Sequence, residues 1–335
     1  MSLPLSVLDL APVPAGTAPA EALRATADLA RLADALGYTR LWYAEHHSMP
    51  GIASSAPEIL IAHAAAATER IRVGSGGIMM QNHVPLKLAE SFRTLAGLYP
   101  GRIDLGVGRA PGTNAATSHA LRAFEPDAFA GQLAELRAYT GDGFPEGHPF
   151  HRVQAVPTGV TLPPVWLLGS SGASAAFAGA NGLGYAFASH FSPAPAAPAL
   201  RAYRSAFTPS EAFPEPHAIL AVAVVCAETP EEADYLAASM DLSWIRLQRG
   251  EFGPFPTPGE ALAYAYTPAE RESILARRAL GITGTPEQVR DRIEALVADA
   301  GADEVMVTTM VHDAGARQRS YRLLAEAFAL DRPAR

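Results

Sequence analysis

Residues 42–47 read Trp-Tyr-Ala-Glu-His-His, and residues 71–77, one structural unit further along, read Ile-Arg-Val-Gly-Ser-Gly-Gly. Each stretch begins as a short apolar run, typical of a buried strand, and ends in polar or very small residues. Five further apolar runs end in the same way. A parallel α/β barrel places its active site at the carboxyl ends of its strands. The repeated pattern therefore predicts an enzyme built on a barrel of this kind.

The composition favours one large domain and argues against several classes of protein. With 335 residues, 49% of them hydrophobic, the chain can bury one large core, and we expect a single domain over residues 1–335. The formal net charge is -8 and Lys87 is the only lysine, so no nucleic-acid or membrane partner is expected. A lone cysteine, Cys226, and an N-terminus without signal-peptide features favour a cytoplasmic protein.

Strand-like and helix-like segments alternate about eight times, the number that closes a (β/α)8 TIM barrel. The expected strands are Leu3–Leu10, Thr39–Tyr43, Ile71–Gly74, Ile103–Val107, Val165–Leu168, Gly184–Phe187, Ala218–Cys226 and Glu304–Thr308. The expected helices are Ala20–Leu36, Pro57–Thr68, Pro85–Leu98, a stretch ending near Tyr139, Ser174–Ala180, Pro195–Phe207, Glu231–Met240 and Ala314–Phe328.

Three segments are too long to be plain connectors and predict insertion loops at the carboxyl face of the barrel. They are residues 110–130, residues 141–163 and Leu242–Thr283. The last contains aromatic and arginine side chains beside a patch rich in glycine and proline, and it is the candidate lid. A new helix is then expected after Thr285, a plausible N-cap that is followed by proline.

Two histidines directly follow the second predicted strand, where they would lie at the barrel mouth. Histidine is the usual general acid or base near neutral pH. Because neighbouring residues of an extended chain point to opposite sides, only one of His46 and His47 is expected to face the cavity. The structural alternative is that both make ordinary hydrogen bonds. Ser189-His190 ends the sixth predicted strand and is expected to join the same mouth.

Two further strand ends carry residues suited to an anion. Arg109 follows the fourth strand in a glycine-rich loop, Gly106-Val107-Gly108, whose spacing does not fit a dinucleotide fingerprint. A guanidinium there can contact phosphate, and a surface ion pair is the alternative. Ser170, Ser171 and Ser174 follow the fifth strand and precede a helix, where hydroxyls and free N–H groups bind anions or simply cap the helix.

The small residues after the third strand have two explanations. Glycine at 76 and 77 permits an unusual backbone angle, or lets the main chain approach a flat ligand closely.

Metal ligation looks poor, because zinc motifs are missing and a site would need the scattered residues Asp9, His46 and His190.

Taken together, these stretches resemble the bacterial luciferase-like, flavin-dependent monooxygenases, in particular a branch of small bacterial oxidoreductases. The matching segments are Leu41–His47, Val73–Glu90, Tyr99–Asn114, Val165–Leu183, Ala186–Phe191 and Gly284–Thr309. The resemblance implies a TIM barrel that binds FMN, taken up in its reduced form from a separate flavin reductase. It also implies a reaction of reduced FMN with oxygen that oxidises a small organic substrate.

The resemblance also assigns roles to individual residues. It implies that His46 assists proton transfer beside the flavin and that Arg109, Ser170, Ser171 and Ser174 hold the phosphate. Relatives often have a non-proline cis peptide against the flavin ring at the position of Gly76 and Gly77, where this chain has Gly-Gly in place of Ala-Ala. His190 joins the expected cofactor contacts.

The alternatives are a deazaflavin-dependent hydride-transfer enzyme, a metal-dependent hydrolase barrel, and a flavin-binding protein without turnover. A homodimer through the helices after the second and third strands is also expected, because relatives are commonly dimeric. The candidate contact residues are Ala64–Ala67, Leu86, Leu88, Phe92 and Leu95, and packing on the barrel is the alternative.

Overall fold

The computed structural model describes residues 3–123, 125–141, 143–192 and 194–330. Within these residues, eight parallel strands form a closed barrel, because β10 pairs with both β1 and β8. The barrel strands are β1 (Leu5–Asp9), β2 (Arg40–Tyr43), β3 (Arg72–Ser75), β5 (Ile103–Gly108), β6 (Val165–Gly169), β7 (Gly184–Ala188), β8 (Ala218–Cys226) and β10 (Glu304–Thr308). The predicted (β/α)8 TIM barrel is confirmed, and each predicted strand agrees to within two residues.

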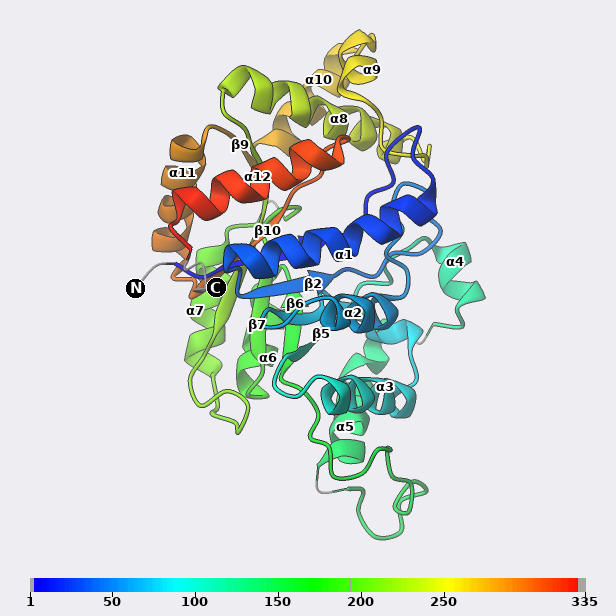
Figure 1. Cartoon of the computed structure of the whole chain (residues 1–335). Coiled ribbons are helices and arrows are strands. Elements are labelled where there is room, and N and C mark those ends of the chain that lie inside the picture. Colours follow the sequence, from blue (N-terminus) through cyan, green and yellow to red (C-terminus); the bar gives the residue numbers. More distant parts are fainter. Residues whose placement is uncertain (1–2, 124, 142, 193, 331–335) are drawn as a thin grey trace.

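Helices surround the barrel (Figure 1). They are α1 (Pro19–Leu36), α2 (Pro57–Ala66), α3 (Pro85–Leu98), α4 (Ala115–Ala120), α5 (Phe129–Thr140), α6 (Gly172–Ala180), α7 (Ala196–Ala206), α8 (Pro230–Gln248), α9 (Pro258–Ala263), α10 (Pro268–Arg278), α11 (Pro286–Ala300) and α12 (Ala314–Ala327). Short elements complete the chain: β4 (Ile78–Met79), β9 (Gly281–Gly284) and the 3-10 turns Met80–Asn82 and Pro126–Ala128.

The connection between β8 and β10 differs from the expected loop. α8 continues past Met240 to Gln248, and α9, α10 and β9 follow it in the segment expected to be a lid. β9 pairs with the carboxyl half of β8, from Ala223 opposite Gly281 onward. α11, with Thr285 as its N-cap as expected, then returns the chain to the barrel beside α12. Figure 1 shows α8, α9 and α10 together at one end of the molecule. The candidate lid is therefore a helical insertion.

The position of residues 141–163 is a correction. The segment connects α5 to the start of β6, so it lies at the amino ends of the strands, opposite the active-site end of a barrel. Figure 1 shows it beyond α5, away from the insertion. Phe144 of this segment packs on Tyr139 of α5, with the ring centroids 4.8 Å apart. The segment takes no part in the site described below.

A buried network of charges ties the amino ends of several barrel strands together. Arg40 contacts Glu304 at 2.7 Å and Asp104 at 2.8 Å, and Arg72 contacts Asp104 at 2.6 Å. Burial alone would raise the pKa of Glu304, but Arg40 and the imidazole of His217 outweigh it and hold this pKa at about 2. The carboxylate is therefore charged and paired at neutral pH.

Most of the apolar residues expected to form a dimer surface instead pack inward, whereas Ala66 is exposed and Leu86 is half-buried. Ala65 and Phe92 are 1% and 0% exposed, and Leu88 and Leu95 are also buried against the barrel. On the same two helices, Ile59 is 66% exposed and Leu98 is 63% exposed. These outward side chains replace the buried ones as candidates for any contact between copies.

Among the described residues, no helix has the length and apolarity needed to cross a bilayer.

Candidate active site

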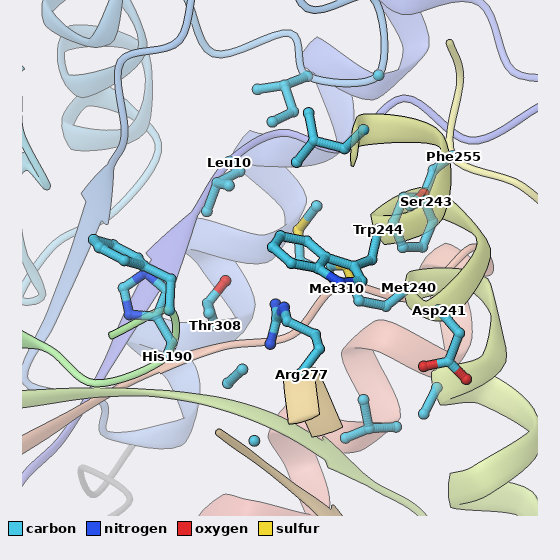
Figure 2. A pocket seen from close by; sticks show the side chains of 18 of the residues that line it. Leu10, His190, Met240, Asp241, Ser243, Trp244, Phe255, Arg277, Thr308 and Met310 are labelled. Carbon is cyan, nitrogen blue, oxygen red and sulfur yellow. The ribbon is translucent and has the colours of Figure 1, made fainter. Parts of the chain in front are cut away.

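A cavity of about 340 Å³ lies at the carboxyl ends of β1, β8 and β10, beneath the helical insertion. Its wall is largely apolar and aromatic, as Figure 2 shows. The apolar lining includes Leu10, Ile52, Phe191, Val225, Met240, Trp244, Leu247, Phe252, Phe255 and Met310. Apolar cavities of this size with a few polar groups are typical sites for small molecules. The insertion contributes a wall of this cavity, consistent with its expected covering role.

His46 and His190 both line this cavity, and each has a buried Nδ1 atom without a hydrogen-bond partner among the described residues. Burial lowers the pKa of His46, although the neighbouring Glu45 opposes the shift. Burial also lowers the pKa of His190 to about 4, with smaller contributions in the same direction from Arg277 and His46. Both imidazoles are therefore neutral at pH 7 and are free to accept or donate a proton.

Glu45 and His47, in contrast, are fully engaged with each other and with neighbouring loops. The buried Glu45 carboxylate contacts His47 Nε2 at 2.8 Å and His83 Nε2 at 2.9 Å, and accepts a hydrogen bond from Asn82. These partners overcome the effect of burial and lower the pKa of Glu45. The structure thus turns His46 toward the cavity and His47 away from it, in agreement with the expected alternation. Glu45 holds the β2 loop against the residues that follow β4.

Gly76 and Gly77 follow β3 and are buried, and the peptide between them is cis. A Cβ atom on Gly76 would lie 2.7 Å from the Leu8 side chain, and one on Gly77 would lie 2.9 Å from the Gly106 carbonyl oxygen. The close packing therefore disfavours a side chain at Gly77, where the obstacle is backbone, more than at Gly76, where it is the end of a leucine side chain.

The β6–α6 junction forms the expected helix N-terminus. Ser171 is the N-cap, and its hydroxyl accepts a hydrogen bond from the Ser174 amide. The Ser174 hydroxyl donates to the Ser171 carbonyl at 2.9 Å and lies 3.0 Å from the Tyr185 hydroxyl. Ser171 therefore caps α6, as one interpretation predicted, and the N-terminus of this helix is also exposed to solvent. Ser170 and the exposed first turn of the helix leave N–H groups available to an anion.

Arg109 lies close to this helix N-terminus. Burial raises the pKa of Tyr185, while Arg109 acts in the opposite direction, so its guanidinium is within electrostatic range of the tyrosine hydroxyl. The Arg109 side chain is exposed, and its guanidinium has no hydrogen bond or ion pair within the described chain. The surface ion pair that would explain this arginine without a ligand is therefore not found among the described residues.

The strand order arranges these groups around one mouth. The Arg109 and Ser171 region follows the adjacent strands β5 and β6, whereas the apolar cavity lies across the barrel at β8, β10 and β1. His46, after β2, and His190, after β7, come from the strands between these two regions. Gly76, Gly77, Arg109 and the three serines do not line the apolar cavity itself.

Several cavity residues escaped the sequence analysis. Thr308 ends β10 and has a buried hydroxyl without a partner among the residues described. Arg277 enters from the insertion, where no strand-end rule applies, whereas Trp244 is one of the aromatic residues that indicated the candidate lid. The sequence did carry a signal for the helices of this region. Four threonines that each precede a proline cap the helices α8, α9, α10 and α11, namely Thr229, Thr257, Thr267 and Thr285.

The residues named for the metal-dependent hydrolase hypothesis do not lie together. In the described part of the chain, no group of three or more histidine, cysteine, aspartate or glutamate side chains is arranged to hold a metal ion. Asp9 is paired with Arg317 at 2.8 Å inside the barrel, whereas His46 and His190 line the cavity.

Comparison with known families agrees with this arrangement. The model of the luciferase-like monooxygenases matches residues 3–304. The chain belongs to the luciferase-like monooxygenase family. This confirms the resemblance found in the sequence. A relative described as a luciferase-like monooxygenase from Escherichia coli (strain K12) is 42% identical over 325 residues, which cover 96% of each chain.

Two further relatives of this family member are informative. The N-acetyl-S-alkylcysteine monooxygenase of Bacillus subtilis (strain 168) is 35% identical over 96% of this chain and 97% of its own. The crystal structure of apo-MsnO8 superposes with a TM-score of 0.90 at 42% identity, over 99% of both chains. Luciferase-like monooxygenases thus share both the sequence and the barrel geometry described here.

Proposed function

We propose that this member of the luciferase-like monooxygenases uses reduced FMN and molecular oxygen to oxidise a small organic substrate. The observation that carries the proposal is the division of one barrel mouth into an anion-binding side and an apolar cavity, with two neutral histidines between them. A phosphorylated, flat cofactor needs the first side, and an organic substrate needs the second. Family membership supports the monooxygenase reaction class.

The residues present fit a flavin mononucleotide. The exposed first turn of α6, with Ser170 and Ser171, and the unpaired Arg109 would hold its phosphate. The buried peptide between Gly76 and Gly77 and the unpartnered His190 Nδ1 would face its ring system. When bound, reduced FMN supplies the electrons for the reaction with oxygen. A separate flavin reductase is proposed to deliver it.

The chain itself contributes proton handling and exclusion of water. His46 has a lowered pKa and an unpartnered, buried Nδ1, so it can take up a proton at neutral pH and return it. The aromatic wall from the insertion, with Trp244 and Phe255, shields the reacting groups from solvent. By excluding water, this wall would limit unproductive side reactions at the site.

The deazaflavin alternative differs in its need for oxygen. Both cofactors carry a phosphate and a flat ring, so the anion side fits either. His46 does not separate the two cofactors, because hydride transfer from an alcohol also releases a proton that a neutral imidazole can accept. The match to the luciferase-like monooxygenases is what favours the FMN reaction.

The direct test is anaerobic titration of the protein with reduced FMN, oxidised FMN and riboflavin, followed by admission of oxygen. We expect FMN in at least one redox state to bind much more tightly than riboflavin, and oxygen to be consumed by the loaded protein. Tight binding of a deazaflavin with no binding of FMN would contradict the proposal.

A further inference from the structure

One charged side chain in the apolar cavity has neither a hydrogen bond nor an ion pair among the described residues, and its guanidinium contacts only an aromatic ring. Arg277, on the last turn of α10, lines the cavity and is half-buried. Figure 2 shows its guanidinium pointing toward the middle of the cavity, between His190 and Trp244. Its guanidinium carbon lies 5.8 Å from the centre of the Trp244 ring. In the residues that the structure describes, Arg277 has no hydrogen bond and no ion pair.

The adjacent arginine on the same helix shows the contrast. Arg278 donates two hydrogen bonds to Asp241 from Nε, at 3.0 Å, a third from Nη2, at 2.7 Å, and one to Asp234 at 2.9 Å. Asp241 also lines the cavity, but Arg278 uses both of its carboxylate oxygens. The nearest carboxylate is thus already neutralised, and Arg277 keeps an uncompensated positive charge.

The other groups of the cavity do not compensate this charge. His46 and His190 are neutral at pH 7, and the Thr308 hydroxyl carries no charge. Glu251 is part of the lining, but it is exposed to solvent, where its charge is screened. Burial lowers the pKa of Arg277, as expected for a guanidinium partly removed from water, and Asp241 opposes this shift.

A half-buried cation without an anionic partner has lost part of its hydration, and an arginine in this situation recognises planar anions through two parallel hydrogen bonds. Among the described residues, Arg277 is the one arginine of the lining without an ion pair. Its single charge balances a ligand with one negative charge but not a ligand with two. The remaining wall is apolar and aromatic, which suits a hydrocarbon, aryl or thioether body. These facts together specify the chemistry of the ligand.

We propose that Arg277 binds the carboxylate of the substrate, so that the cavity selects singly charged organic acids whose apolar body lies against Trp244, Met240 and Met310. The assignment of the cavity to the substrate rests on the function proposed above, whereas binding of a carboxylate by Arg277 does not. Arg277 is thereby a specificity-determining residue, supplied by the insertion and not by a barrel strand.

The test uses pairs of probes that differ only in charge: 3-phenylpropionate, 4-phenylbutyrate and octanoate, each with its primary amide. Calorimetric titration without flavin should show at least one acid binding about tenfold or more tightly than its amide, the scale of a hydrogen bond to a charged group. Arg277→Met should remove the preference. Arg277→Lys should keep part of it, because the charge remains but the two parallel hydrogen bonds are lost.

Arg271→Met is the matched control. Arg271 lies on the same helix, outside the cavity, with its guanidinium 5.7 Å from the Tyr266 ring, so its loss removes an equal charge without touching the lining. This variant should retain the preference for acids. Thermal unfolding checks that each variant is folded, and Arg277→Gln replaces Arg277→Met if the methionine variant is not.

Three outcomes would overturn the proposal. They are equal or no binding of acid and amide in every pair, an acid preference that survives Arg277→Met, and a loss of the preference in Arg271→Met. FMN affinity is measured in parallel and should not change in Arg277→Met. A tenfold loss there would assign Arg277 to the cofactor and also overturn the proposal. Failure of the wild-type protein to bind any flavin would refute the proposed function alone, because the probe titrations contain no flavin.

Discussion

Replacing Arg109 by alanine should weaken FMN binding while leaving the fold and riboflavin binding intact. The guanidinium lies beside the α6 N-terminus, within electrostatic range of the Tyr185 hydroxyl, and has no protein partner among the described residues. A hydrogen bond to a charged group contributes about 1.5–3 kcal/mol, equivalent to roughly a 10- to 150-fold change in Kd. Because Arg109 is exposed and screened by solvent, we expect the lower end, about tenfold.

The assay is a fluorescence titration of FMN and of riboflavin against the wild-type protein and two variants. Arg152→Ala is the matched control, since Arg152 is exposed but lies in the α5–β6 segment at the opposite end of the barrel. Riboflavin lacks the phosphate, so its Kd should be nearly the same in all three proteins. Equal losses for FMN and riboflavin in Arg109→Ala would refute the assignment of Arg109 to the phosphate.

His46→Ala should reduce turnover by about 10²-fold with little change in FMN affinity, and His47→Ala should do much less; steady-state kinetics with a greater loss for His47 would contradict this. Because the pKa of His46 is lowered, wild-type turnover should fall only below about pH 6.5. Glu304→Gln should reduce the free energy of unfolding at pH 7 by about 3–5 kcal/mol, because it leaves Arg40 without one of its two buried carboxylate partners. Since the folded pKa of Glu304 is depressed to about 2, its contribution is complete above about pH 4.5 and is lost as the pH falls toward 2; urea unfolding should show a flatter acid dependence in the variant. We also expect a two-fold homodimer in which Ile59→Glu yields monomers by light scattering, and a wild-type monomer or an unchanged dimer mass in the variant would contradict this.

The barrel could be predicted from the sequence because each strand is a short apolar run with a polar or small residue at its end. The same rule located His46 and His190, since strand ends meet at one face of a barrel. The direction of His46 followed from the alternation of neighbouring side chains. The cap at Thr285 followed from local hydrogen bonding that does not depend on the rest of the fold.

The insertion could not be predicted in the same way. Its glycine- and proline-rich patch at 250–259 looks like a loop, and helical order returns only where Thr257 and Thr267 cap α9 and α10. Arg277 lies on a helix with many charges, where an exposed ion pair is the ordinary expectation. Only the folded structure shows that Arg278 occupies the nearby carboxylates and leaves Arg277 facing the cavity. Folding also decided the place of Phe92. Its sequence pattern predicted a contact between subunits, but the side chain packs on the barrel.

A crystal structure of the protein soaked with FMN locates the cofactor phosphate directly. We expect the phosphate at the N-terminus of α6, in contact with Ser171 and Arg109, with the ring system extending over Gly76 and Gly77 toward His46. A phosphate bound inside the apolar cavity beside Arg277, or at another face of the barrel, would contradict this expectation.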